Sequence, residues 1–213
     1  MKVQNISNQN FKAIPLAQVK IKGISEPYKL FGVTVHDSSF LQKLVSSINL
    51  KNLMPNLTKE EYEAWEHFFK RAAERGSSQE GKTIIESYND KFCGILNYTE
   101  LPNGFYVNHV VTVPDKESHR VPCAGQILFN ELFYRLIGSK NAKKIELQAY
   151  KQSPFSPISK YLKLGFYPSG GSGCVELMRI FINSIKETLE KQKEFILRIS
   201  IADKSEETLD YIL

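Results

Sequence analysis

The chain has 213 residues, of which 42% are hydrophobic and 24% are charged. This composition is typical of one globular domain and excludes a disordered chain and a disulfide scaffold, and no stretch approaches the ~18 consecutive apolar residues of a membrane span. The formal net charge of +5 includes no compact run of like charges, so it tolerates an anionic ligand and indicates no nucleic-acid partner.

The chain begins with two predicted strands, followed by two predicted helices. The strands cover residues 13–22 and 29–36, which are apolar and β-branched. Apolar residues recur at helical spacing over 40–49, and a second helical pattern ends near residue 76. Thr58 and Glu61 predict the start of this second helix, because each side chain in a capping box bonds the backbone N–H of the other residue. The aromatic stripe that follows is interpreted as core packing.

Strand patterns return after residue 82 and predict a three-strand meander. Its strands cover 83–88, 92–98 and 105–113. Asn89 and Asp90 join the first two strands. Asn103 and Gly104 lie in the second turn, where an Asn-Gly pair favours the positive φ angles of a type I′ loop.

The remaining elements alternate between helix and strand. Helices are predicted for 126–137 and 158–164, and strands for 145–150, 175–180 and a segment that starts at 166–167. The crossover helix between the strands at 105–113 and 145–150 makes that strand pair parallel. The predicted fold class is therefore α/β, with a mixed, mostly antiparallel sheet that has one parallel strand pair and flanking helices.

Residues 1–180 are predicted to form one domain with an extra N-terminal strand, and residues 181–213 a C-terminal helical extension. Ile182, Ile185 and Leu189 have helical spacing, whereas the segment FILRISI alternates poorly for an edge strand and could instead continue the helix. The extension is too apolar for a disordered linker. We therefore expect it to pack on the domain or on a second copy in a homodimer.

The three cysteines, Cys93, Cys123 and Cys174, are an odd set without a C-x-x-C pair. This pattern fits neither a disulfide framework nor a zinc site, so we expect free thiols and no bound metal. Residues 1–11 have no apolar signal-peptide core, and the expected location is the cytoplasm, with no membrane partner.

The segment that is most informative about function connects a predicted strand to a predicted helix. A helix N-terminus presents unpaired N–H groups and the positive end of the helix dipole, which suits a phosphate group. The sequence there is Arg120-Val-Pro-Cys-Ala-Gly125-Gln-Ile-Leu128. It resembles the R/Q-x-x-G-x-G/A segment of the GNAT superfamily of N-acetyltransferases. Arg120, Gly125 and Leu128 match, whereas Cys123 occupies the first glycine position and Pro122 removes one amide.

A second segment, Tyr161-Leu-Lys-Leu-Gly165-Phe166, resembles the Tyr-x-x-x-Gly-Phe motif of the same family. It lies on a short predicted helix after the next strand, in the order and at the distance that the family shows. The predicted order of strands and helices from about Lys29 to Ile180 also resembles the acetyltransferase fold. On these three features the sequence is identified as resembling a GNAT N-acetyltransferase.

The resemblance implies that an amine attacks the thioester of bound acetyl-coenzyme A directly, without a covalent enzyme intermediate. It implies coenzyme contacts from two backbone positions of the preceding strand and from the motif: Val111, Val113, Arg120, Val121, Cys123, Ala124, Gly125 and Gln126. It also implies that Tyr161 protonates the departing thiolate. Such a donor is needed because a thiolate leaves more easily when a nearby O–H gives it a hydrogen bond or proton.

The sequence does not identify the base that accepts the amine proton. His109 lies in the strand before the first motif and has a suitable intrinsic pKa, although a structural histidine fits the same place. Asp115, Glu117 and His119 lie in the loop and are alternatives. The segment SPFSPISK ahead of Tyr161 departs from the asparagine and alanine that family members often carry, which leaves acceptor positioning open.

Two alternatives to this enzyme hypothesis also stay open. Cys123 has the helix N-terminal position of a reactive thiol, but cysteine hydrolase chemistry leaves the Tyr161 motif unexplained. The replacements at Cys123 and Pro122 also fit a catalytically degenerate relative that binds a coenzyme or a protein partner. If the chain is an enzyme, the acceptor is expected to be a primary amine: a small amine, a peptide N-terminus, a protein lysine or an aminoacyl group.

Overall fold

The computed structural model of the protein describes residues 13–33, 38–46, 48–49, 56–76, 81–113, 123–151, 153 and 157–201. Its strands are β1 (Ala13–Ile21), β2 (Tyr28–Val33), β3 (Lys82–Tyr88), β4 (Lys91–Leu101), β5 (Gly104–Thr112), β6 (Lys144–Tyr150), β7 (Tyr167–Ser172), β8 (Val175–Phe181) and β9 (Ile196–Ser200). Its helices are α1 (Ser38–Ser46), α3 (Lys59–Gly76), α4 (Ala124–Gly138), α5 (Pro157–Lys163) and α6 (Ile182–Gln192). No helix within these ranges is long and apolar enough to cross a membrane.

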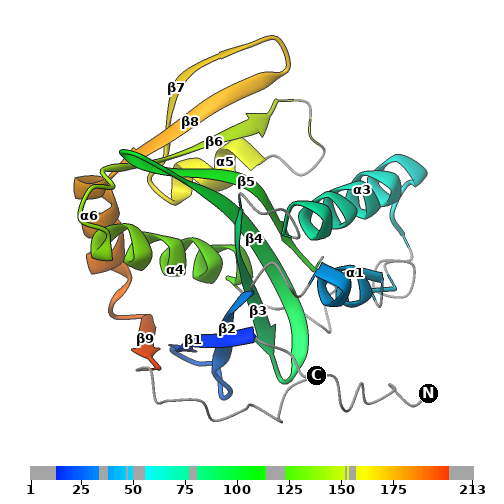
Figure 1. Cartoon of the computed structure of the whole chain (residues 1–213), viewed down its shortest axis with the longest axis horizontal. Helices are drawn as coiled ribbons and strands as arrows, with labels where there is room; N and C mark the ends of the chain where they lie inside the picture. Colours follow the sequence, from blue (N-terminus) through cyan, green and yellow to red (C-terminus); the bar gives the residue numbers. More distant parts are fainter. Residues whose placement is uncertain are drawn as a thin grey trace.

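The described strands form one sheet in the order β7-β8-β6-β5-β4-β3-β2-β1-β9. Every neighbouring pair is antiparallel except β5 with β6, which is parallel. The predicted fold class is confirmed. Helices α4, α5 and α6 cover one face of the sheet, whereas α1 and α3 cover part of the other (Figure 1).

The core consists of two layers, one on each face of the sheet. In β3, Ile84 packs with α4 and its neighbour Ile85 packs with α1 and α3. In β4, Leu96 and Ile95 repeat this alternation. Successive side chains of a strand point to opposite faces, so a strand covered on both sides needs a continuous apolar run. Helix α4 is central to its layer, with nine of its 15 residues buried.

The capping box at the start of α3 is confirmed. The Thr58 N–H donates to Glu61 Oε2 over 2.9 Å, and the Glu61 N–H donates to Thr58 Oγ1 over 3.2 Å. The aromatic stripe that follows is core packing, as predicted: Phe69 is buried and Trp65 stacks on it at 5.9 Å between ring centroids.

The two turns of the meander differ from each other. Asn89 and Asp90 have φ values of 50° and 56°, as a type I′ turn requires. The predicted positive φ at Asn103 and Gly104 is wrong. The turn is centred on Pro102 and Asn103, and a proline ring fixes φ near about −65°. Gly104 already belongs to β5, where a Cβ would overlap the carbonyl oxygen of the first residue of β6.

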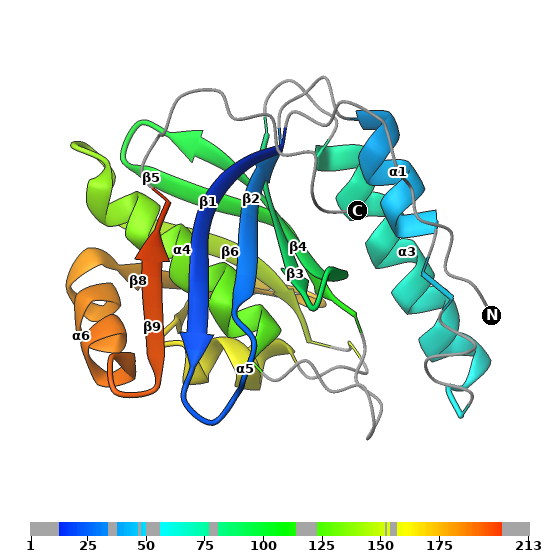
Figure 2. The same ribbon diagram turned by 90° about the horizontal axis from the view of Figure 1, so that it is seen from below.

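The C-terminal elements are integrated into the domain. Helix α6 buries Ile185 and Leu189 in the layer that contains α4. Strand β9 then pairs with β1 from Ile196 to Ser200 and forms one edge of the sheet (Figure 2). Residues 182–192 are therefore a helix, the segment that the sequence left open between strand and helix is a strand, and both elements pack on this domain.

The sequence of β9 misleads because its alternation is inverted. The half-buried Arg198 points inward, and its Nε donates to Oε2 of the buried Glu131 over 2.8 Å. Glu131 also accepts from Arg135 Nε over 3.2 Å. The apolar Leu197 and Ile199 lie on the other face, where they are 56% and 42% exposed. A charged residue inside and apolar residues outside is the reverse of the usual strand signal.

Glu86 of β3 is a buried carboxyl that no described residue hydrogen-bonds. Burial raises its pKa well above the ordinary value of 4.5, so the folded protein keeps a proton that the unfolded chain releases. The free energy of unfolding therefore falls as the pH rises from about 4.5 and levels off above the raised pKa. We expect Glu86→Met to remove this pH dependence and to add about 1–3 kcal/mol near pH 8, because an unpaired buried polar group is lost.

Urea unfolding at pH 5 and pH 8 measures this effect. Glu86→Gln is the control, because it keeps a buried polar group and removes only the titration. A Met variant that is less stable than the parent at both pH values would contradict the explanation.

Candidate active site

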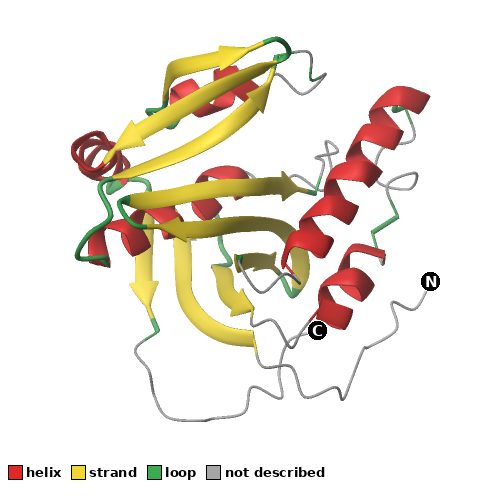
Figure 3. Ribbon diagram, turned by 45° about the horizontal axis from the view of Figure 1, so that its top comes forward, coloured by secondary structure: helices red, strands yellow, loops and turns green. Residues whose placement is uncertain are grey.

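Strands β5 and β6 are paired only at their beginnings. The parallel pairing joins residues 104–107 of β5 to residues 144–147 of β6. Both strands continue beyond it, β5 to Thr112 and β6 to Tyr150, while each keeps its antiparallel neighbour on the other side. The strands separate from that point, and two free strand edges face each other (Figure 3).

A β-bulge in β5 explains where the separation begins. Val107 pairs with Tyr98 of β4, and His109 pairs with Asn97, so Asn108 is an extra residue between them. A bulge bends its strand and increases the local twist. The bend follows directly after the last residue that pairs with β6. The side chain of Asn108 donates to Thr99 Oγ1 over 2.9 Å, which holds the bulge against β4.

The bulge also decides which backbone groups face the free edge. The Val113 N–H donates to the Cys93 carbonyl of β4 over 2.7 Å. Backbone groups alternate along a strand, so those of Val111 also point to β4, and those of Val110 and Thr112 point to the free edge. The resemblance implied coenzyme contacts at Val111 and Val113. These two contacts stay a prediction, and in the structure the backbone groups of both residues point to β4.

Helix α4 begins beside the end of β5. A Cβ added at Gly125 would lie 3.8 Å from Thr112 Cγ2, an ordinary contact distance. The amides of Ala124, Gly125 and Gln126 form the first turn, where an α-helix leaves N–H groups without partners inside the helix. Their partial positive charge suits an anion. Arg120 and Val121, like Asp115, Glu117, His119 and Pro122, lie outside the described residues.

Cys123 precedes α4 in a left-handed backbone conformation, with φ 66°. Its carbonyl accepts the first helical hydrogen bond, from the Ile127 N–H over 2.9 Å. A non-glycine residue in this conformation costs about 1–3 kcal/mol, whereas glycine adopts it freely. Cys123 is exposed, and all three cysteines lie outside any disulfide, as predicted.

The Tyr161 motif is a helix C-terminus. The Phe166 N–H donates to the Tyr161 carbonyl and the Gly165 N–H donates to the Leu162 carbonyl, each over 3.0 Å. These two bonds define a Schellman motif, which requires a left-handed residue just after the helix. Gly165 supplies it, with φ 92°. The spacing of tyrosine, glycine and phenylalanine is therefore set by how α5 ends.

The Tyr161 ring lies between α5 and α4. It meets Phe129 of α4 edge-on at 5.7 Å between centroids and Phe166 at 5.9 Å. Burial raises the pKa of Tyr161 to about 12, so its hydroxyl keeps its proton at neutral pH. No hydrogen bond joins this hydroxyl to a residue in the described ranges. It is therefore an available O–H donor.

His109 lies just after the bulge, on the other face of the sheet. Burial lowers its pKa, and electrostatic interactions with Arg75, Arg71 and His67 on α3 lower it further, while Glu74 acts in the opposite direction. The half-buried imidazole is therefore neutral at neutral pH and accepts a proton. His109 and Tyr161 thus approach the separated strands from opposite faces, one beside α3 and one from α5.

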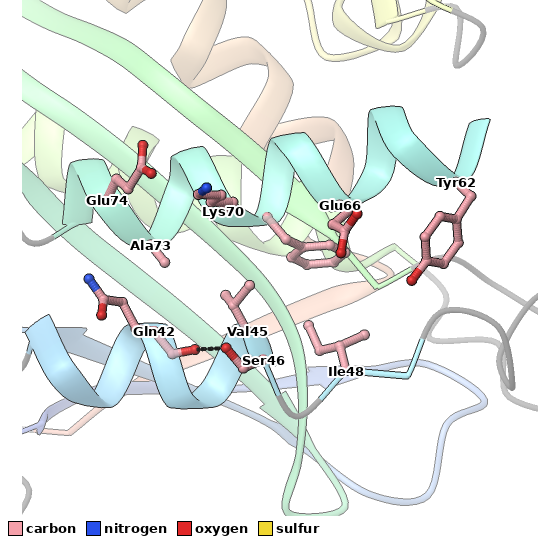
Figure 4. Close-up of a pocket in the computed structure, with 10 residues that line it drawn as sticks. Gln42, Val45, Ser46, Ile48, Tyr62, Glu66, Lys70, Ala73 and Glu74 are labelled. Carbon is pink, nitrogen blue, oxygen red and sulfur yellow. Dashed lines mark hydrogen bonds between the residues drawn. The ribbon is translucent and has the colours of Figure 1, made fainter. Parts of the chain in front are cut away.

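A separate pocket of about 410 Å³ lies between α1 and α3 (Figure 4). Val45, Ile48 and Phe69 contribute apolar surface, and Glu66 and Lys70 are charged residues of its lining. None of the site residues predicted from the sequence lines this pocket. The sequence patterns predicted both helices. They did not indicate a pocket between the helices, because the pocket depends on how α1 and α3 pack.

The similarity of this chain to known proteins lies in its fold. No family model and no curated protein matches the sequence. Among solved structures, an uncharacterized protein from Bacillus halodurans is similar over 85% of this chain and 97% of its own, with a TM-score of 0.57 and 12% identity. FdhC, a nucleotide-linked sugar GNAT, has a TM-score of 0.54 and 15% identity over 88% and 98% of the two chains. The PaiA N-acetyltransferase from Thermoplasma acidophilum in complex with coenzyme A has a TM-score of 0.51 and 16% identity over 74% and 99%.

Proposed function

We propose that this chain, which has the fold of the GNAT N-acetyltransferases, transfers an acetyl group from acetyl-coenzyme A to a primary amine. The observation that carries the proposal is the separation of β5 from β6 beside the N-terminus of α4. It brings a free strand edge close to the unpaired amides of a helix. A long ligand with an amide-containing arm and phosphate groups needs both features.

The coenzyme phosphates are proposed to bind at the first turn of α4. The donors are the amides of Val121, Cys123, Ala124, Gly125 and Gln126, with Arg120 adding charge. The arm of the coenzyme then follows the free edge of β5, where Val110 and Thr112 supply backbone groups. The solved complex of PaiA with coenzyme A supports this donor for a protein of the same fold.

The reaction forms a C–N bond as the thioester C–S bond breaks. We assign His109 to accept the proton of the attacking amine, because its pKa is lowered and its imidazole is neutral. Tyr161 faces the departing sulfur. Its pKa of about 12 lies above that of a thiol, about 8.5, so the hydroxyl stabilises the thiolate by hydrogen bonding and keeps its own proton.

The second candidate function is a degenerate module that binds the coenzyme without catalysis. The strained Cys123 at the helix start favours it, because the backbone there is less free to adapt to a phosphate than glycine would be. Binding with no amine-dependent release of coenzyme A is the result that distinguishes this module from an enzyme.

Gly125→Leu tests the coenzyme site. The added side chain has room in the fold but occupies the space that a phosphate needs, so we expect acetyl-coenzyme A affinity to fall at least tenfold without loss of stability. Thermal melting measures binding, since ligand at ~100 times Kd adds ~2.7 kcal/mol to the stability of the parent. Gly138→Leu, at the other end of the same helix, is the matched control, because nothing lies near an added Cβ there. Equal ligand-induced shifts in both variants, or no shift of the parent at millimolar ligand, would contradict the assignment.

A further inference from the structure

The pocket between α1 and α3 lies outside the site proposed for acetyl transfer. Its volume of about 410 Å³ falls within the range of about 300–1,000 Å³ that is usual for small-molecule pockets. Its lining comes from α1, from Ile48 just after α1, and from α3 (Figure 4). No described strand contributes to this lining, so a ligand in the pocket does not enter the gap between β5 and β6.

The inner part of the pocket is apolar and aromatic. Phe69 of α3 is buried, and Val45 and Ile48 on the α1 side are half-buried in the same layer of the core. The Phe69 ring stacks on Trp65 at 5.9 Å between centroids and contacts Phe92 of β4 at 6.2 Å. These two ring contacts hold Phe69 in place, so the apolar surface is preformed. Such a surface suits an apolar or aromatic group of a ligand.

Two residues of opposite charge line the same pocket. Glu66 and Lys70 are exposed and lie one helical turn apart on α3, the spacing at which a glutamate and a lysine commonly pair. The described ion pairs within α3 join other residues: Lys59 with Glu63, and Arg71 with Glu74. Within the described ranges, neither Glu66 nor Lys70 has an ion pair or a side-chain hydrogen bond. Both charges are therefore available to a ligand.

Two other polar groups of the lining are engaged within their own helices. Ser46 Oγ donates to the Gln42 carbonyl over 2.7 Å, the contact that is dashed in Figure 4. The Glu74 carboxylate is 3.2 Å from Arg71 Nη1. A ligand thus meets one free negative and one free positive charge. A ligand with a single charge complements only one of them, whereas a zwitterion complements both.

We propose that this pocket binds an α-amino acid with a large apolar or aromatic side chain. The ammonium group pairs with Glu66, the carboxylate pairs with Lys70, and the side chain of the ligand lies against Phe69. Four residues of a helix span about 6 Å along its axis. The two charged groups of an α-amino acid share one carbon atom, so its head group can bridge two side chains that do not pair with each other.

Isothermal titration calorimetry of the full chain tests four ligands that share parts of one structure. L-Phenylalanine has all three groups, phenethylamine lacks the carboxylate, 3-phenylpropionate lacks the ammonium group, and glycine lacks the apolar side chain. We expect phenylalanine to bind about three- to fivefold more tightly than either singly charged ligand, because exposed ion pairs contribute little. Glycine should bind more than about tenfold more weakly than phenylalanine, because burial of the apolar side chain is the larger contribution.

Two substitutions show which residue meets which group. Glu66→Gln should weaken the binding of phenylalanine and phenethylamine about three- to fivefold and leave that of 3-phenylpropionate unchanged. Lys70→Gln should weaken the binding of phenylalanine and 3-phenylpropionate by the same factor and leave that of phenethylamine unchanged. Glu63→Gln and Lys59→Gln, on the same helix but outside the pocket lining, are the matched controls and should change neither.

Each variant is melted to show that it folds, and binding of phenylalanine should weaken between about 0.05 M and about 0.5 M salt. The titrations contain no coenzyme, so their outcome does not depend on whether the protein transfers acetyl groups. Absence of phenylalanine binding at millimolar concentration would overturn the proposal. So would equal affinity of the parent for phenylalanine and a singly charged ligand, or an affinity for phenylalanine that survives both the Glu66 and the Lys70 substitutions.

Discussion

Tyr161→Phe is expected to lower kcat about 100-fold and to leave the affinity for acetyl-coenzyme A nearly unchanged. The substitution removes only the hydroxyl, which no described residue hydrogen-bonds and which keeps its proton because burial raises its pKa to about 12. The ring contacts with Phe129 and Phe166 and the Schellman hydrogen bonds do not involve the hydroxyl. The loss therefore falls on the step in which the thiolate departs.

Steady-state kinetics and thermal melting with the coenzyme measure the two halves of this prediction. Tyr88→Phe is the matched control, because it removes a hydroxyl from a half-buried tyrosine of β3, which lies away from β5 and β6. Turnover of the Tyr161 variant equal to that of the parent would show that Tyr161 serves only packing.

Deletion of all residues after Phe181 is expected to abolish cooperative folding. It removes Ile185 and Leu189 of α6, both buried against the layer of α4. Truncating one such side chain costs about 2–5 kcal/mol, and the whole stability of a domain is about 5–15 kcal/mol. The deletion also removes Arg198 and leaves the buried Glu131 with Arg135 alone.

Circular dichroism melting and size-exclusion chromatography test this expectation. Two single substitutions provide a comparison. Ile185→Ala should lower the free energy of unfolding by about 2–5 kcal/mol, while Leu197→Ala on the exposed side of β9 should lower it by under about 0.5 kcal/mol. A truncated chain that is monomeric and as stable as the parent would show that α6 and β9 are dispensable. The homodimer stays a prediction. Light scattering tests it by measuring the molecular mass of variants in which the exposed apolar side chains of β9 are replaced.

Much of the fold follows from local signals in the sequence. The capping box of Thr58 and Glu61 marks the start of α3, and the crossover helix between β5 and β6 determines that their pairing is parallel. These features depend on a few neighbouring residues or on element order. The sequence therefore predicts the start of α3 and the direction of the β5–β6 pair, and the structure agrees with both predictions.

Features that depend on register were not predictable in the same way. Nothing in the residue types marks Asn108 as the extra residue of a bulge, yet the bulge decides that Val110 and Thr112 face the free edge. The inward Arg198 of β9 makes sense only beside Glu131, which is 67 residues away in sequence.

The most direct test of the account is whether the parent protein acetylates an amine. Purified protein, acetyl-coenzyme A and a panel of small primary amines are combined, and free coenzyme A thiol is measured together with the mass of the product. We predict amine-dependent thiol release, matched mole for mole by an N-acetylated amine. Binding of acetyl-coenzyme A with no thiol release above the rate without amine, across the whole panel, would contradict it and leave a coenzyme-binding module.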